Sequence, residues 1–132
     1  KYPSAEIFAI DILEMEQIKG VKFIQEDLRN IEKIDQLSSL KNKFNLVISD
    51  LAPNLSGISS IDEENILELN LLTLEGAIKF LDNNGVFIVK TFQNSNLKKF
   101  RKEMEKNLKI VQTAKPAASK KQSKEIYLYG IK

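Results

Sequence analysis

Residues 44–57, FNLVISDLAPNLSG, predict the centre of the fold. The apolar run 44–48 is too short for a helix and contains β-branched residues, which is typical of a strand buried on both faces of a parallel sheet. It ends at Asp50, and a proline, an asparagine and a glycine then form a turn. Open α/β sheets bind ligands at the carboxyl ends of their strands, so Asp50 is the first candidate functional residue. An aspartate that only caps a turn or helix is an equally weighted alternative.

Composition restricts the chemistry. The chain has 132 residues, without cysteine or histidine. This excludes disulfides, thiolate nucleophiles, Cys/His zinc sites and histidine acid–base catalysis, and leaves carboxylates, lysines, hydroxyls or a cofactor. No apolar run reaches the length of a membrane span, and the first residues do not resemble a signal peptide. We therefore expect one domain covering residues 1–132, a cytoplasmic monomer, and neither a metal nor a membrane partner.

Charge is distributed unevenly along the chain. Residues 1–89 carry 8 Lys/Arg and 15 Asp/Glu, a net charge of −7, whereas residues 90–132 carry 12 and 3, a net charge of +9. Such a basic end favours a polyanionic partner, most simply nucleic acid. A solvated lysine-rich surface is the alternative explanation.

Strands and helices alternate in the predicted secondary structure. Asn30 is predicted to cap a short helix that carries Ile31, Ile34 and Leu37, and Ser60 to Glu63 have the spacing of a capping box. Helices are also expected at residues 60–81 and 96–107, and strands at residues 5–10, 21–25, 44–50, 85–89, 108–113 and 125–129. Residues 12–20 form a connection with room for a helical turn. The pattern predicts an α/β fold with a mostly parallel, doubly wound sheet, and an antiparallel pair formed by the last two strands.

Acidic residues follow three of the predicted strands. Asp11, Asp27 and Asp50 are expected along one rim of the sheet. Carboxylates there can accept hydrogen bonds from ribose hydroxyls and from an adenine amino group, which favours a nucleoside-bearing cofactor. Neither a GxGxxG nor a Walker GxxxxGK[ST] motif occurs, so nicotinamide and nucleotide-hydrolase functions lack their main support.

Three blocks of sequence resemble one enzyme family. SDLAPNLSG at residues 49–57, GVFIVKTFQ at residues 85–93, and KPAAS followed by SKEIY within residues 115–127 are similar to the FtsJ-type ribosomal RNA 2'-O-ribose methyltransferases. The blocks occur in the order and spacing of that family. The resemblance extends from about Ile7 to the end of the chain.

The resemblance implies a Rossmann-like fold, S-adenosylmethionine as cofactor, and a Lys-Asp-Lys-Glu tetrad that methylates ribose. Asp50, Lys90 and Glu125 match the Asp, the second Lys and the Glu. Asp11 matches the acid that faces the cofactor's ribose, and Asp27 the acid that faces the adenine. The asparagine in DLAPN resembles the branch that acts on large-subunit ribosomal RNA, and a uridine 2'-hydroxyl is the expected target.

A lysine that accepts the proton of a ribose hydroxyl needs a pKa lowered by burial or by another cation. Lys90, at the end of a buried strand, is placed for that role, with Asp50 and Glu125 to orient it. The ordinary alternative is a lysine at a strand end. RNA phosphates are expected on the basic end of the chain, at Lys98, Lys99, Arg101, Lys102, Lys115, Lys120, Lys121 and Lys124.

The chain departs from the family pattern at its start. The family's first strand, glycine-rich cofactor loop and first tetrad lysine are expected before Lys1. This departure favours one alternative, a non-catalytic RNA-binding or ribosome-assembly module. A tRNA ribose methyltransferase is a further alternative, and so is a dehydrogenase-like cofactor enzyme, which the missing glycine fingerprint disfavours.

Overall fold

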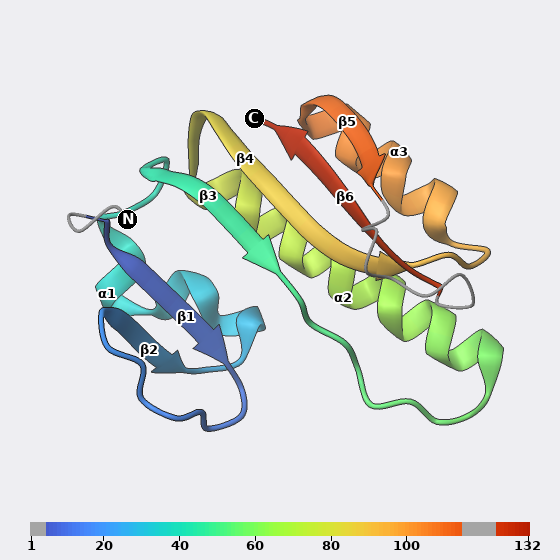
Figure 1. Cartoon of the computed structure of the whole chain (residues 1–132), viewed down its shortest axis with the longest axis horizontal. Coiled ribbons are helices and arrows are strands. Elements are labelled where there is room, and N and C mark those ends of the chain that lie inside the picture. Colours follow the sequence, from blue (N-terminus) through green and yellow to red (C-terminus); the bar gives the residue numbers. More distant parts are fainter. Residues whose placement is uncertain (1–4, 115–123) are drawn as a thin grey trace. The chain divides into compact units, whose positions relative to one another are not determined.

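The structure is a computed structural model that describes residues 5–114 and 124–132 (Figure 1). The chain divides into two compact units, Lys1–Ser39 and Leu40–Lys132. Each unit is described by itself below.

The first unit contains two parallel strands and two short helices. Strand β1 (Ile7–Asp11) pairs with β2 (Val21–Gln25) in parallel register, as the sequence predicts. The 3-10 helix η1 (Leu28–Lys33) and the helix α1 (Asp35–Ser38) follow.

Two local predictions for this unit are wrong. Asn30 lies inside η1 and does not cap it, because the cap is Asp27, whose side chain accepts a hydrogen bond from the Arg29 backbone N–H. An aspartate that accepts from a backbone N–H two residues later begins a helix as well as an asparagine does. Residues 12–20 contain no helix.

The second unit is built on a four-stranded sheet in the order β3-β4-β6-β5. Strand β3 (Phe44–Ser49) is parallel to β4 (Leu81–Phe92), whereas β6 (Glu125–Ile131) is antiparallel to both β4 and β5 (Lys109–Ala114). The predicted antiparallel pairing of the last two strands is confirmed. Strand β5 forms one edge of the sheet and β3 the other, and Leu46 and Ile48 of β3 are exposed. The expectation that β3 is buried on both faces is therefore wrong in this structure.

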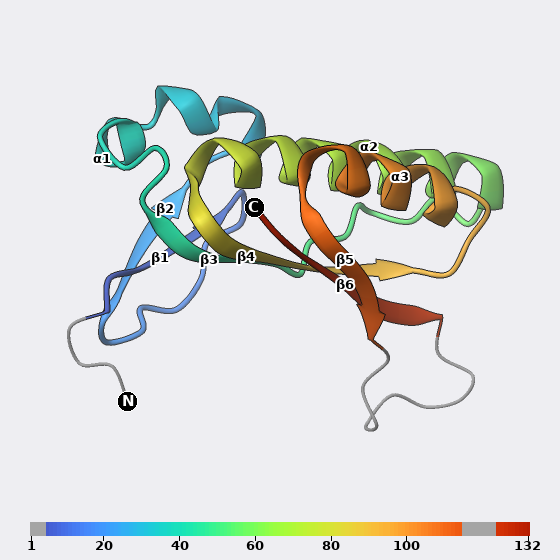
Figure 2. The ribbon, with the colours of Figure 1, turned by 90° about the horizontal axis from the view of Figure 1, so that it is seen from above.

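Both long helices of the second unit lie on the same face of its sheet (Figure 2). They are α2 (Ser59–Phe80) and α3 (Leu97–Asn107). The core lies between this face and the two helices, and consists of Leu67, Leu74, Ala77, Leu81, Phe87, Val89, Phe100, Met104, Leu108 and Leu128. Within the described part of this unit, no helix lies on the opposite face of the sheet. A doubly wound sheet has helices on both faces, and this unit has them on one face.

The start of α2 differs from the predicted capping box. The helix begins at Ser59, and its N-cap residue, Ile58, makes no side-chain cap. Its end agrees with the prediction to within one residue, and β4 begins at the next residue, Leu81. Only glycine fits at position 85 of β4, because a Cβ there would lie 3.0 Å from the Phe44 carbonyl oxygen on β3.

None of the helices in residues 5–114 and 124–132 has the length and apolar character needed to cross a membrane.

Candidate active site

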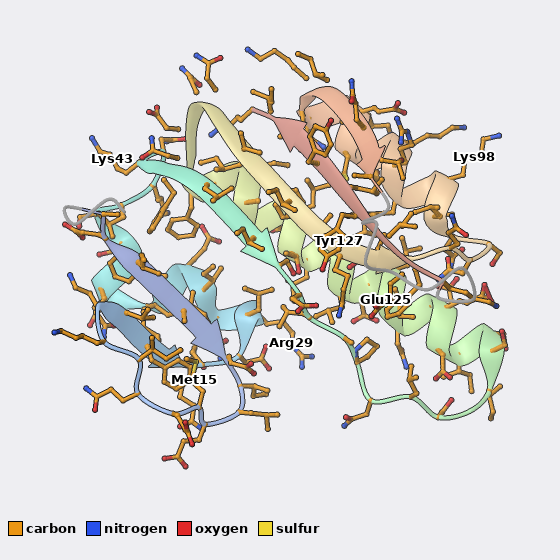
Figure 3. All side chains as sticks on the ribbon, in the orientation of Figure 1. Met15, Arg29, Lys43, Lys98, Glu125 and Tyr127 are labelled. Atoms are coloured by element: carbon orange, nitrogen blue, oxygen red, sulfur yellow. The ribbon has the colours of Figure 1, made fainter. Side chains whose placement is uncertain are left out.

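Asp50, Lys90 and Glu125 come together from three adjacent elements of the second unit. The parallel register of β3 and β4 makes Asp50, the residue after β3, level with Lys90. Tyr127 of β6 pairs directly with Lys90, so Glu125, two residues earlier, lies diagonally across on the same face of the sheet. Figure 3 labels Glu125 and Tyr127, which both lie on β6.

The amine of Lys90 lies between two carboxylates. Its Nζ is 2.5 Å from Asp50 Oδ1 and 3.2 Å from Glu125 Oε2. The Lys90 side chain is 19% exposed, compared with 65% for Asp50 and 42% for Glu125. The lysine is therefore held at a defined place, while the two carboxylates are more exposed to solvent.

The surroundings of Lys90 raise its pKa above the ordinary lysine value. The largest cause is the hydrogen bond that Lys90 donates to Asp50. Partial burial opposes the rise, and the contact with Glu125 adds to it. This direction is opposite to the lowered pKa expected from the sequence, because two nearby negative charges outweigh the desolvation of the ammonium.

Asp62 holds the loop that follows Asp50. Its carboxylate accepts hydrogen bonds from the Ser56 backbone N–H at 2.7 Å, the Ser56 hydroxyl at 2.8 Å and the Gly57 N–H at 3.2 Å. These bonds lower the pKa of Asp62, with the Ser56 N–H as the largest cause. Sequence reasoning placed Asp62 in a helix start and missed this role. The capping-box spacing indicated the start of α2 to within one residue, but it did not indicate that Asp62 bonds to Ser56 and Gly57.

Glu63 ties α2 to the turn that follows β4. Its Oε1 accepts from both the N–H and the hydroxyl of Ser95, each at 2.9 Å, and its carbonyl accepts from the Asn96 side-chain amide. The same turn bonds to the start of β6, since the Gln93 N–H donates to the Lys124 carbonyl at 2.8 Å. The ends of the two strands that carry Lys90 and Glu125 are thus joined to each other and to α2.

In the first unit, Asp11 and Asp27 lie at the same edge of the β1–β2 pair. Asp11 is level with Gln25, two residues before Asp27, and the Asp11 carbonyl accepts from the Glu26 N–H at 3.0 Å. Asp11 Oδ1 accepts from the Leu13 N–H.

Asp27 is also engaged by Arg29. It forms an ion pair with that guanidinium at 3.1 Å, and its pKa is lowered, chiefly by the hydrogen bond from the Arg29 backbone N–H. Asp27 therefore has a capping role in addition to the cofactor role expected from the sequence.

The predicted RNA-binding residues have different surroundings. Lys98, Lys99 and Lys102 are exposed on α3, and Lys124 is exposed beside Glu125. Arg101 instead ties α3 to β5, because its guanidinium donates to the Thr113 hydroxyl and to the Val111 carbonyl. The predictions for Lys115, Lys120 and Lys121 lie outside the described residues.

Comparisons with known proteins give the family of the sequence. A family model for the FtsJ-like methyltransferases matches residues 1–132. Ribosomal RNA large subunit methyltransferase E of Dechloromonas aromatica (strain RCB) is 43% identical over 126 residues, which are 94% of this chain and 62% of that protein. The protein of the same name from Acinetobacter baumannii is 40% identical over 126 residues, 94% of this chain and 58% of that protein. The chain spans about three fifths of the length of these relatives.

Solved structures give the fold. A Plasmodium falciparum protein described as a ribosomal RNA methyltransferase has a TM-score of 0.78 at 24% identity, and the match covers 96% of this chain and 71% of that one. A Streptococcus mutans methyltransferase in complex with SAH has a TM-score of 0.59 at 16% identity, over 96% and 70% of the two chains. These likenesses confirm the predicted Rossmann-like α/β fold.

Proposed function

We propose that this chain, which belongs to the FtsJ-like methyltransferase family, carries the site of an enzyme that uses S-adenosylmethionine to methylate the 2'-hydroxyl of a uridine in large-subunit ribosomal RNA. The observation that carries the proposal is the Lys90 amine held between Asp50 and Glu125. The relatives from Dechloromonas aromatica and Acinetobacter baumannii are named ribosomal RNA large subunit methyltransferases, which supports the substrate class.

Acidic side chains of this chain fit the polar groups of the proposed cofactor. Asp11 ends β1 and Asp27 follows the adjacent parallel strand β2 in the first unit, and Asp50 follows a parallel strand of the second. Carboxylates in such positions accept hydrogen bonds from ribose hydroxyls and from an adenine amino group. We assign Asp11 to the ribose, Asp27 to the adenine and Asp50 to the methionine end. The Streptococcus mutans structure, solved with SAH, supports a cofactor of this class.

When bound, S-adenosylmethionine supplies a methyl group on a sulfonium, already activated for transfer. The ribose 2'-hydroxyl is a weak nucleophile, so the protein must align it and receive its proton as the new O–CH₃ bond forms. Asp50 and Glu125 orient the Lys90 amine, and the neutral amine takes the proton.

Both carboxylates stabilise the ammonium form of Lys90 and so raise its pKa. The neutral amine is therefore a minor form near pH 7, and its fraction increases as the pH rises. The small fraction of neutral amine is offset by the geometry of the site, which holds the Lys90 nitrogen at one defined place.

RNA phosphates are proposed to lie on basic residues of α3 and of the segment before β6. Lys98, Lys99 and Lys102 of α3 and Lys124 before β6 are exposed. We keep Arg101, Lys115, Lys120 and Lys121 in this set as predictions. Such contacts position a substrate and carry no base sequence information.

The test is transfer of a labelled methyl group. The protein is incubated with methyl-labelled S-adenosylmethionine and large ribosomal subunits that lack ribose methylation. We expect label in the ribosomal RNA, in a dinucleotide that resists alkali because its 2'-oxygen is methylated. Label on a base, or on transfer RNA instead, would contradict the proposal. RNA binding without transfer or cofactor affinity would favour a non-catalytic binding module.

A further inference from the structure

A buried hydrogen bond joins α2 to β4 one residue away from Lys90. The side-chain amide of Asn70 donates to the Thr91 hydroxyl at 2.7 Å. Asn70 is 4% exposed and Thr91 is 3% exposed. The core around them is apolar, and includes Leu67, Leu74 and Val89.

A polar pair in such a core is a weak source of stability. A net hydrogen bond is worth little after desolvation, and apolar residues of the same shape often replace a buried polar pair without loss. The pair does have one property that apolar contacts lack. It is directional, so it specifies one register of α2 against β4, whereas aliphatic side chains tolerate small shifts.

The hydrogen bond between Asn70 and Thr91 specifies the position of α2 against β4, the strand that carries Lys90. Thr91 follows Lys90 on the strand, so the two side chains leave opposite faces of the sheet. Thr91 also pairs with Ile126 of β6, the residue after Glu125. Fixing Thr91 therefore fixes the backbone positions of both Lys90 and Glu125.

We propose that Asn70 and Thr91 are positioning residues, whose hydrogen bond sets β4 and β6 against α2 and thereby places the Lys90 amine between Asp50 and Glu125. The inference rests on the proposed role of Lys90 but adds two residues to the site. Both are buried between α2 and the sheet, on the side opposite to the Lys90 side chain.

The test uses matched variants of buried residues. Thr91→Val leaves Asn70 unpaired, and the double variant Asn70→Leu/Thr91→Val replaces the bond with apolar contacts and leaves no unpaired group. Thr91→Ser keeps the hydroxyl. The control is Thr73→Val, because Thr73 is 6% exposed, lies on the same helix, and donates its hydroxyl to the Leu69 carbonyl within that helix.

The first measurement is the titration of the Lys90 amine, followed by NMR of labelled lysine side chains in the protein without substrate. We expect the pKa of Lys90 to fall toward the ordinary lysine value in Thr91→Val and in the double variant, because the amine leaves its carboxylates. Thr73→Val and Thr91→Ser should keep the wild-type titration.

The second measurement is steady-state methyl transfer. We expect kcat to fall about 10- to 100-fold in the double variant, with KM for the cofactor and for RNA unchanged, because a displaced amine loses alignment and not substrate binding. Thr73→Val should keep the wild-type kcat.

An unchanged Lys90 titration in a folded double variant would overturn the inference, and so would a kcat loss no larger than that of Thr73→Val. Absence of methyl transfer by the wild-type protein would instead contradict the proposed function. The titration does not depend on that activity, so the two failures are distinguishable.

Discussion

At Lys90, burial and charge act in opposite directions. Removing an ammonium from water lowers its pKa, whereas nearby carboxylates raise it. The carboxylates prevail, led by the hydrogen bond to Asp50. The result is an amine that is accurately held but mostly protonated near neutral pH. The reaction then depends on how much of the neutral form the pH provides.

This dependence gives a prediction for the pH profile. If the neutral amine of Lys90 accepts the proton, kcat should rise about tenfold per pH unit through neutral pH and continue to rise above pH 8, because the raised pKa moves the plateau to higher pH. The measurement is log kcat against pH at saturating substrates between pH 6 and pH 10, a range that lies below the raised pKa of Lys90. A plateau already reached below pH 7 would show that the proton goes to another group.

Single residues show what the sequence could predict. Asp50 and Lys90 are predicted from strand ends and from the family resemblance, and Glu125 from the resemblance alone. The structure brings the three together. The direction of the Lys90 pKa could not be predicted. It depends on whether two carboxylates lie within hydrogen-bond distance, and neither the apolar pattern of a strand nor the spacing of motifs contains that distance.

At the scale of elements, the carboxyl end of α2 depends on a residue distant in sequence. The Lys132 amine donates to the carbonyls of Ile78 at 2.7 Å and Leu81 at 2.8 Å, and to the Asn42 side chain at 2.7 Å. It satisfies carbonyls at the end of the helix and places a positive charge at the negative end of its dipole.

We therefore expect Lys132→Met to destabilise the second unit by about 1.5–3 kcal/mol, the range for hydrogen bonds to charged groups. The measurement is the free energy of unfolding in urea. Lys109→Met is the control, because Lys109 is an exposed lysine on the edge strand β5, and we expect it to change stability little. Equal stability of the two variants would show that Lys132 is not a helix cap.

Element boundaries and internal polar contacts differ in how well the sequence predicts them. The apolar pattern predicted α2 and α3 to within one residue, because amphipathic periodicity determines which helix face is buried. It did not predict that Asn70 and Thr73 are buried within α2. The partner of Asn70, Thr91 of β4, is supplied by the tertiary structure, whereas Thr73 bonds to the Leu69 carbonyl of its own helix.

At the scale of the whole molecule, the basic end of the sequence, residues 90–132, predicts how RNA is held. Exposed lysines of α3 are proposed phosphate contacts, and each contact released by substitution should reduce the salt dependence of binding. Lys98→Ala/Lys99→Ala should lower the slope of log affinity against log salt by about two units, one for each contact, for any RNA sequence.

The control for this measurement is Lys41→Ala/Lys43→Ala, which removes the same charge from the amino end of β3. Figure 3 shows Lys43 and Lys98 at opposite ends of the second unit. Binding of RNA is measured between 50 mM and 200 mM salt, with cofactor affinity expected to be unchanged. If both pairs reduce the slope equally, RNA is attracted by net charge alone and not by a surface on α3.

If Lys90 accepts the proton of the ribose 2'-hydroxyl, its removal should abolish methyl transfer, and single-turnover transfer by Lys90→Ala measures this. Lys79→Ala is the matched control, since Lys79 lies on α2 and pairs with Glu75, away from the cluster. We predict that Lys90→Ala loses transfer and keeps its affinities for S-adenosylmethionine and RNA, while Lys79→Ala stays active. A Lys90→Ala protein that transfers the methyl group at the wild-type rate would contradict the claim.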